Sequence, residues 1–274
     1  MTRTRRSAAF IGPEGGRLFS IFHCPVGGRR DCVLLVPPFA EEMNKTRRML
    51  TLVAQALAAR GFLCVLPDLY GTGDSDGDFE DASWDGWRQD LGRVRSHLLK
   101  EGVRVSHAVA VRTGCALLAE AAKQEAWALS STVFWQPVSD GSRYLRQFLR
   151  LRVAASLMED DRRETVGELR SRLRDGQSLE VAGYQVSSRL ADELDKVSLA
   201  PDLSHDIGDL HWIEIVRGGG HELSQTSSSI IDAAREKGIR VESATIRGEP
   251  FWSSTEIVRI SPLIERTVDT LVAA

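Results

Sequence analysis

The chain has 274 residues, of which 42% are hydrophobic and 27% charged, and its formal net charge is -3. This length suits one large α/β domain, and this composition is that of a globular protein that can bury a core, which argues against disorder and a second full domain. A weakly acidic chain has no field for gathering nucleic acid or anionic lipid, so we expect neither as a partner.

The start of the chain and its cysteines indicate the compartment. The basic start, 1–6, has no apolar run after it, and Gly12 and Pro13 soon interrupt the chain, which is unlike a secretory signal. No segment approaches the ~20 apolar residues that span a bilayer. The four cysteines have neither CxxC nor metal-ligand spacing. We therefore expect a cytoplasmic protein with reduced cysteines, no metal and no cofactor.

The first half of the chain alternates short apolar runs with helical patterns. Apolar segments at 18–23 and 32–36 flank the turn signal Gly27-Gly28, which predicts a hairpin that leads into a buried strand. The pattern then predicts, in chain order, a helix over 44–60, a strand over 62–66, a glycine and aspartate loop over 68–78, a helix over 84–99, a strand over 105–111, a helix over 113–123 and a strand over 131–135.

The pattern changes over 139–199, where helical spacing and many arginines occur and no convincing strand precedes Tyr184. The alternation then resumes with a strand over 210–216, a helix over 227–237, a strand over 241–246 and a helix over 257–272. Because parallel strands need crossover connections, this order predicts a doubly wound, mostly parallel sheet. We expect a core over 1–138 and 201–274, interrupted by a helical cap insertion over 139–200.

The segment 110–114, Ala-Val-Arg-Thr-Gly, joins a predicted strand to a predicted helix, with small residues at both ends. In α/β-hydrolases a strained turn of this kind carries the nucleophile above the carboxyl edge of the sheet. Here the apex is Arg112, which stays protonated and is a poor nucleophile. Two interpretations stay open: Arg112 is a structural residue near a helix start, or Arg112 and Thr113 bind an anion beside the first amides of the helix.

A second segment, 73–77, matches the letters of the nucleophile motif G-x-S-x-G. No strand comes directly before this segment and no helix directly after it, whereas the nucleophile turn needs both. The charges of Asp74 and Asp76 also disfavour ionisation of Ser75. We interpret this segment as a glycine-rich rim loop that brings Asp74 to the pocket. Ser75 remains the alternative nucleophile.

A standard triad needs a histidine after the last strand. The chain has no histidine after His221, and the loop after the last predicted strand offers Glu249 and the apolar pair Phe251-Trp252 instead. His221 follows the penultimate strand and could reach the same rim, or it is a solvated loop residue. We therefore predict that the standard triad is absent, with His221 and Glu249 as candidate bases.

The loop 36–45 occupies the place that supplies one oxyanion-hole amide in this fold, and Phe39 N–H would be the donor. Glu41 and Glu42 follow it. They could pair with Arg112 if they point inward; otherwise they are solvated acids near the start of the next helix, where negative charge is favourable.

These segments carry a family resemblance: 37–45 (Pro-Pro-Phe-Ala-Glu-Glu-Met-Asn-Lys), 71–75 (Gly-Thr-Gly-Asp-Ser), the Arg112 elbow and 250–252 (Pro-Phe-Trp). Over nearly its whole length the chain resembles the exosortase A system-associated hydrolases of type 2. The resemblance implies an α/β-hydrolase fold and a companion of bacterial exopolysaccharide loci and the PEP-CTERM sorting system. Ala110 is a mild departure from the family at the elbow.

Two functions follow as alternatives. The first is an accessory protein, with partners in polysaccharide biosynthesis, that uses Arg112 to hold an anionic small molecule or an anionic lipid-linked or sugar intermediate. The second is a hydrolase or acyltransferase that acts on an ester or thioester through Phe39 N–H and a nonstandard nucleophile or activated water. Its candidate bases are Glu41, Glu42, His221 and Glu249.

Overall fold

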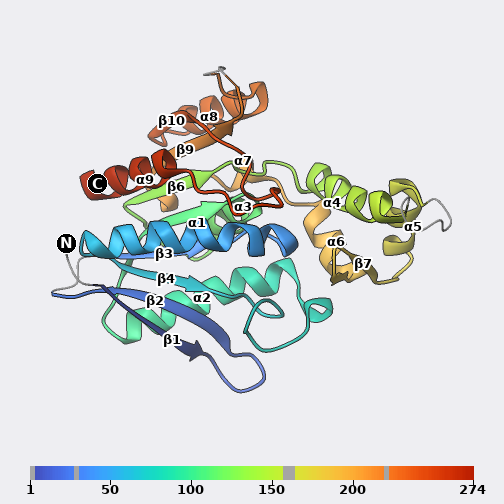
Figure 1. The fold of residues 1–274 in the computed structure, drawn as a ribbon, viewed down its shortest axis with the longest axis horizontal. Coiled ribbons are helices and arrows are strands. Elements are labelled where there is room, and N and C mark those ends of the chain that lie inside the picture. Colours follow the sequence, from blue (N-terminus) through green and yellow to red (C-terminus); the bar gives the residue numbers. More distant parts are fainter. Residues whose placement is uncertain (1–3, 28–30, 157–163, 219–221) are drawn as a thin grey trace.

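The computed structural model describes residues 4–27, 31–156, 164–218 and 222–274. Its main body is one eight-stranded sheet in the order β1-β2-β4-β3-β5-β6-β9-β10 (Figure 1). The pairs from β4 to β10 are parallel, whereas β2 runs antiparallel to both β1 and β4. The strands are β1 (Thr4–Ile11), β2 (Leu18–Pro25), β3 (Cys32–Val36), β4 (Leu63–Pro67), β5 (Val105–Val111), β6 (Ser131–Trp135), β9 (Asp209–Val216) and β10 (Val241–Arg247).

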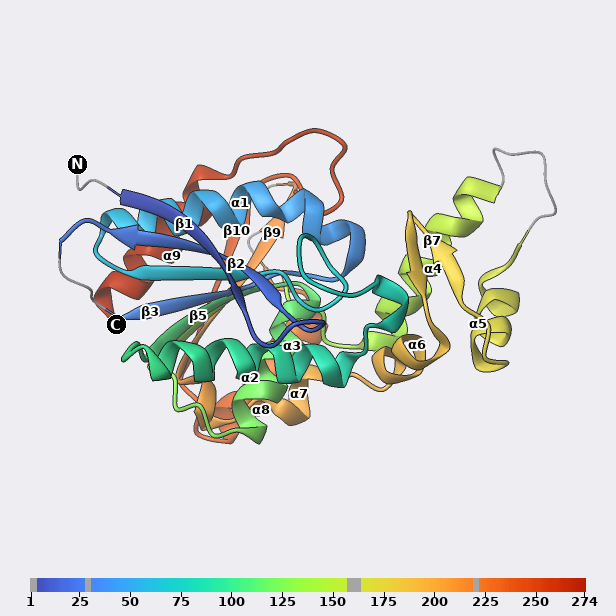
Figure 2. The ribbon, with the colours of Figure 1, turned by 90° about the horizontal axis from the view of Figure 1, so that it is seen from below.

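Helices cover both faces of this sheet, as a mostly parallel sheet requires (Figure 2). On one face lie α1 (Ala40–Ala59) and α9 (Ser261–Ala273), and on the other lie α2 (Trp84–Lys100), α3 (Thr113–Gln124) and α8 (Gln225–Glu236). Successive strand residues point to opposite faces, so Leu34 belongs to one apolar core and its neighbour Val33 to the other. Both cores lie behind the carboxyl edge of the central strands and make that edge rigid.

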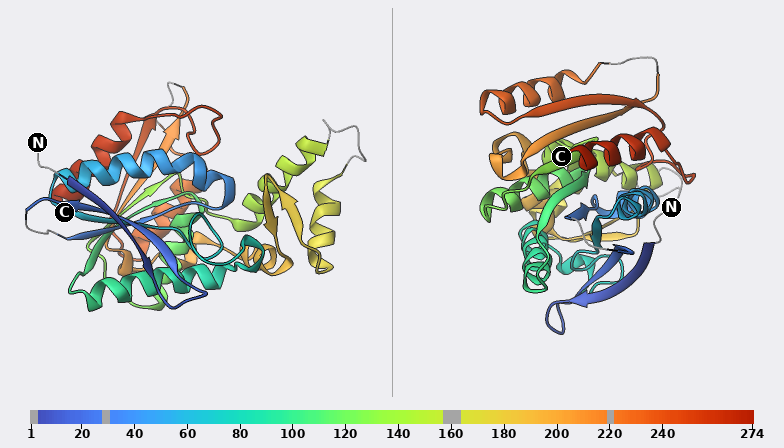
Figure 3. Two further views of the ribbon diagram at one scale, coloured as in Figure 1. Left: turned by 60° about the horizontal axis from the view of Figure 1, so that its bottom comes forward. Right: turned by 90° about the vertical axis from the view of Figure 1, so that its left-hand side faces the viewer.

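A lobe projects from one end of the sheet between β6 and β9 (Figure 3). It contains α4 (Gly141–Ser156), α5 (Val166–Arg174), the hairpin of β7 (Leu179–Val181) and β8 (Tyr184–Val186), and α6 (Ser188–Asp195). The short helix α7 (Leu199–Asp202) leads back to the sheet. The expectation that no strand precedes Tyr184 is wrong, because β7 does; three residues are too few to show an alternating pattern.

The predicted hairpin around Gly27-Gly28 is also wrong. Strand β2 pairs with β1 and β4, while β3 lies between β4 and β5. Every residue of β3 is buried, which suits a central strand, whereas seven of the eight residues of β1 are exposed, which suits an edge. Strand β1 carries Arg5, Arg6 and small residues, so its sequence has no apolar alternation from which the strand could be predicted.

Two helix starts differ from their predictions. Helix α1 begins at Ala40 rather than at Asn44, because acidic residues in its first turn hide the buried positions there. Helix α9 begins at Ser261 rather than at Ile257, with Pro262 in its first turn, where a proline is tolerated. No helix in the described ranges combines the length and hydropathy that crossing a bilayer requires.

Candidate functional site

Arg112 stands at the apex of a tight turn between β5 and α3. Its backbone has φ 55° and ψ -119°, a conformation that a residue with a side chain rarely adopts. Gly114 allows this turn to pack against the loop after β3, because a Cβ there would lie 2.5 Å from the carbonyl oxygen of Pro37. The turn therefore projects the Arg112 side chain over the carboxyl edge of the sheet.

Backbone strain gathers at this edge. Besides Arg112, which directly follows β5, Gln136 (φ 47°) directly follows β6, and Ala40 (φ 49°) is the first residue of α1, after the loop that leaves β3. Such residues cost about 1 to 3 kcal/mol each and persist where the surroundings hold them in place, often at functional sites. This edge of the sheet is thus the candidate site.

The Arg112 guanidinium is held on three sides. Its Nη2 donates to Oε1 of Glu42 at 3.1 Å and its Nε to Oε2 at 3.2 Å, while Nη1 donates to the carbonyl oxygen of Gln136 at 3.3 Å. The guanidinium carbon lies 5.0 Å from the ring centre of Trp252 and 5.9 Å from that of Tyr144, within cation–π range. The pairing of Glu42 with Arg112 that the sequence left open is present in the structure.

This pair leaves part of the guanidinium available. Arginine has five N–H donors, and the bonds to Glu42 and Gln136 use the donor on Nε and one on each terminal nitrogen. One donor on Nη1 and one on Nη2 have no acceptor among the described residues. Arg112 can therefore bind a further acceptor without breaking its pair with Glu42.

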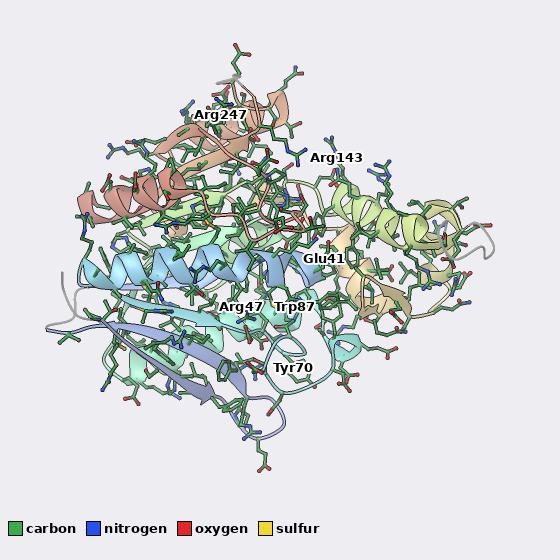
Figure 4. All side chains as sticks on the ribbon, viewed as in Figure 1. Glu41, Arg47, Tyr70, Trp87, Arg143 and Arg247 are labelled. Atoms are coloured by element: carbon green, nitrogen blue, oxygen red, sulfur yellow. The ribbon has the colours of Figure 1, made fainter. Side chains whose placement is uncertain are left out.

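Burial governs the acids beside Arg112. Glu42 is 6% exposed, and this burial raises the pKa of its carboxyl group while the Arg112 charge opposes the rise. The Tyr144 hydroxyl is buried close to Glu42 without a well-formed hydrogen bond, and burial together with the two glutamates raises its pKa well above the usual range. Glu41 is half-buried, and Oε2 of its carboxyl group has no hydrogen-bond partner among the described residues (Figure 4).

We expect the half-buried Glu41 to make stability depend on pH. Burial raises the pKa of Glu41 from 4.5 to about 7. The folded state thus binds more protons than the unfolded chain between these values, so stability falls as pH rises from about 4.5 to about 7. Glu41→Gln should leave the free energy of unfolding unchanged at pH 4.5 and raise it by about 1 to 3 kcal/mol at pH 8. Urea unfolding at both pH values, with exposed Glu236→Gln as control, checks this; an equal effect at both would contradict it.

Phe39, directly before α1, lies at the centre of an aromatic cluster beside the elbow. Its backbone N–H donates to Oγ1 of Thr113 at 2.9 Å, so the predicted oxyanion-hole donor is already engaged within the protein. Its ring contacts four aromatic rings at centroid distances of 5.0 to 5.9 Å, from Phe79, Trp87, Tyr144 and Phe148. The adjoining cavity measures only ≈ 20 Å³, which is room for about one water molecule.

Ser75 lies in a loop that its side chain stabilises by two hydrogen bonds. Its hydroxyl donates to the carbonyl oxygen of Asp68 at 2.7 Å and accepts from the backbone N–H of Phe19 at 2.8 Å. Asp74 is exposed in the same loop, and its N–H donates to the Asp68 carboxylate. Neither side chain lines the cleft at Arg112, so the structure does not bring Ser75 and Asp74 to the elbow.

The two hydrogen bonds of Ser75 predict a structural role. Ser75→Ala should lower the free energy of unfolding by about 1 to 2 kcal/mol, because Phe19 N–H loses its acceptor in a part-buried place. Ligand binding at Arg112 should stay as in the wild type. Urea unfolding measures the first effect and a thermal shift with ligand the second; lost binding in a folded variant would contradict this role.

Of the candidate bases, Glu42 pairs with Arg112, whereas Glu249 is engaged elsewhere. Glu249 pairs with Arg217 at 2.9 Å on the surface, where its side chain is 59% exposed. His221 lies outside the described residues. Phe251 is buried and Trp252 covers Arg112, so an apolar ring occupies the loop after β10 where a standard triad has its base.

An open cleft of ≈ 310 Å³ lies on the outer side of Arg112, between β6, β9 and the start of α4. Arg143, labelled at the start of α4 in Figure 4, is one of its lining residues. On the inner wall Glu214, which is 6% exposed, accepts hydrogen bonds from the N–H of Ser224 and the hydroxyl of Ser227. The sequence analysis missed this cleft, since its residues come from four separate segments without a shared motif.

No group of three or more histidine, cysteine, aspartate or glutamate side chains within the described ranges could hold a metal ion. Two carboxylates at the edge are engaged within the protein, Glu42 by Arg112 and Glu214 by the start of α8. What the edge offers chemically is a fixed cation with two spare donors, beside a polar cleft.

No family model and no curated protein matches the chain. Solved structures do. The chain is similar to Est1E from Butyrivibrio proteoclasticus with bound ferulic acid (TM-score 0.71, 14% identity, 97% of this chain and 98% of that one). It is also similar to a thermostable carboxyl esterase from Bacillus coagulans (TM-score 0.60, 11% identity, 98% of this chain and 97% of that one). A further similar structure is the thioesterase domain from the curacin biosynthetic pathway (TM-score 0.58, 13% identity, 98% of this chain and 98% of that one). With the strand order and the elbow, these likenesses establish an α/β-hydrolase fold for the chain.

Proposed function

We propose that this protein binds an anionic ligand at Arg112 and has given up the covalent chemistry of the α/β-hydrolase fold. The observation that carries the proposal is Arg112 itself. It occupies the strained apex where a nucleophile would stand, and it keeps two guanidinium donors for a ligand. A guanidinium suits planar anions such as carboxylates and phosphates, since its donors match their geometry.

The surroundings of Arg112 support binding over acyl transfer. Thr113 engages Phe39 N–H, the Phe39 ring fills the inner pocket, and Trp252 lies where a base would be. The part of Arg112 that remains open faces a polar cleft. The pair with Glu42 fixes the guanidinium, which lowers the cost of ordering it on binding.

The resemblance to exosortase A system-associated hydrolases supports a place for this protein beside bacterial exopolysaccharide and PEP-CTERM systems, with an anionic sugar or lipid-linked intermediate as ligand and partners in polysaccharide biosynthesis. The four cysteines are free thiols, which suits the cytoplasm. The second candidate is a hydrolase or acyltransferase on an ester or thioester. The esterases and thioesterase among its structural neighbours favour it, and Glu41, with an unpartnered carboxylate oxygen, would be its base.

Thermal unfolding with added anions tests the proposal. Galacturonate and inorganic phosphate should raise the melting temperature of the wild type in a concentration-dependent way, because a ligand that binds only the folded state stabilises it. Arg112→Gln should remove this shift. Arg217→Gln, which removes the same charge from an exposed pair with Glu249, should keep it.

A fluorophosphonate probe separates the two candidates. We expect no labelled serine in the wild type, and none in Arg112→Gln. Labelling of Ser75, Ser224 or Ser227 would overturn the binding role in favour of the hydrolase. So would an anion response that Arg112→Gln leaves unchanged.

A further inference from the structure

Three arginines form a stripe along the exposed face of α4. Arg143, Arg146 and Arg150 are spaced three and four residues apart, so they lie on one side of the helix over about 10 Å. All three are exposed, and no carboxylate within the described part of the chain lies within ion-pair distance of any of them. Among the other arginines of the lobe, Arg152 and Arg172 are paired with Glu164 and Arg170 with Asp195, whereas Arg174 at the end of α5 has no ion pair among the described residues.

The stripe is continuous with the cleft. Arg143 belongs to both, because it begins the stripe and lines the cleft that contains Arg112 (Figure 4). A cation track therefore runs from the elbow to the outer part of the lobe, on a protein whose net charge is -3. Three adjacent cations without an ion-pair partner among the described residues repel one another, so they favour a ligand that places several negative charges along the helix.

The cleft walls indicate what kind of anion enters. Beyond the arginines they carry amides and hydroxyls, from Gln136, Ser139, Gln147, Ser224, Thr226 and Ser227. Two carboxylates also line the cleft: Glu214 accepts hydrogen bonds from Ser224 and Ser227, and Asp140 accepts one from the backbone N–H of Arg143. Such groups hydrogen-bond a hydroxyl-rich ligand, whereas an acyl chain would need an apolar wall. The apolar inner cavity, by contrast, has room for about one water molecule.

We infer that the ligand is an acidic oligosaccharide, whose terminal sugar carboxylate binds Arg112 in the cleft and whose following acidic sugars lie along Arg143, Arg146 and Arg150. This inference rests on the proposed function, and it adds the chemical class of the ligand and its path over the lobe. A membrane surface fits less well, because Leu151 is the one exposed large apolar side chain among the described lobe residues, and interfacial helices need a continuous apolar face.

Fluorescence anisotropy with fluorescein-labelled hexagalacturonate tests this path. The hexamer should have a lower Kd than galacturonate, whose Kd is measured by competition against the labelled hexamer. Neutral maltohexaose should not displace the labelled hexamer. Arg146→Gln combined with Arg150→Gln should weaken hexamer binding about five- to tenfold, as expected for two exposed charged contacts. The same variant should keep the thermal shift with galacturonate.

The matched control is Arg5→Gln combined with Arg6→Gln on β1, which removes the same charge from the far edge of the sheet and should leave binding unchanged (Figure 1). Equal affinities of the stripe variant and this control would overturn the path. Binding of hexaglutamate as tight as that of hexagalacturonate would also overturn the proposal, because it would point to an acidic peptide as the ligand. Sedimentation with phosphatidylglycerol vesicles that depends on the stripe would overturn it too, because it would point to a membrane. If galacturonate binding itself does not depend on Arg112, the proposed function fails instead.

Discussion

Glu42→Ala is expected to lower the free energy of unfolding by about 3 to 5 kcal/mol, because it leaves the mostly buried Arg112 guanidinium without its counter-ion. An arginine cannot escape this cost by losing its proton. Arg112→Met should cost less than Glu42→Ala at pH 5, since burial raises the pKa of Glu42 and the unpaired carboxyl group can become neutral. The cost of Arg112→Met should then grow as the pH rises. Urea unfolding at pH 5 and pH 8 measures both effects.

The exposed pair of Arg217 and Glu249 provides the matched control. Glu249→Ala removes the same kind of partner on the surface and should cost no more than about 1 kcal/mol. Combining Arg112→Met with Glu42→Leu should recover most of the loss caused by Glu42→Ala, because an apolar pair needs no compensation. Equal costs for Glu42→Ala and Glu249→Ala would contradict the buried pair.

Phe39→Ala is expected to lower the free energy of unfolding by about 3 to 5 kcal/mol. The Phe39 side chain is the centre of an aromatic cluster that joins α2 and α4, and the residue is 3% exposed. Its loss opens a cavity in the inner pocket while the backbone bond from Phe39 N–H to Thr113 can persist. Thermal and urea unfolding measure the loss.

Phe10→Ala is the control for this substitution, because Phe10 is 49% exposed on β1. It should cost no more than about 1 kcal/mol. The cavity left by Phe39→Ala lies beside the elbow, so this variant should also gain affinity for small apolar ligands such as benzene, which the wild type has no space to bind. A variant as stable as the wild type, without such binding, would show that the cluster closes over the gap.

The architecture of the fold does not depend on which groups stand at the carboxyl edge of the sheet. The strained turns at Ala40, Arg112 and Gln136 remain at the carboxyl edge. At one of them, Arg112 forms an ion pair with Glu42 and lies against the ring of Trp252. The fold depends on buried strands and on small residues such as Gly114, and neither needs a catalytic group.

The sequence by itself determined the parts of this protein that depend on local pattern. Strand β3 is a continuous apolar run, and β5 is apolar from Ala108 to Val111. The elbow follows from small residues between such a run and a helix, so both could be predicted without coordinates. The arginine at the apex and the lack of a histidine after His221 are likewise facts of the sequence.

Only the tertiary structure decided which groups meet. Strand pairing depends on contacts between distant segments, so β1 joined β2 while β3 took a central place. The choice of Glu42 over Glu41 as partner of Arg112 depends on which residue of the first turn of α1 faces inward, and that phase is set by packing against the sheet. The cleft brings together Arg112 from the turn after β5, Arg143 from α4 and Glu214 from β9, and no local pattern links residues so far apart in the chain.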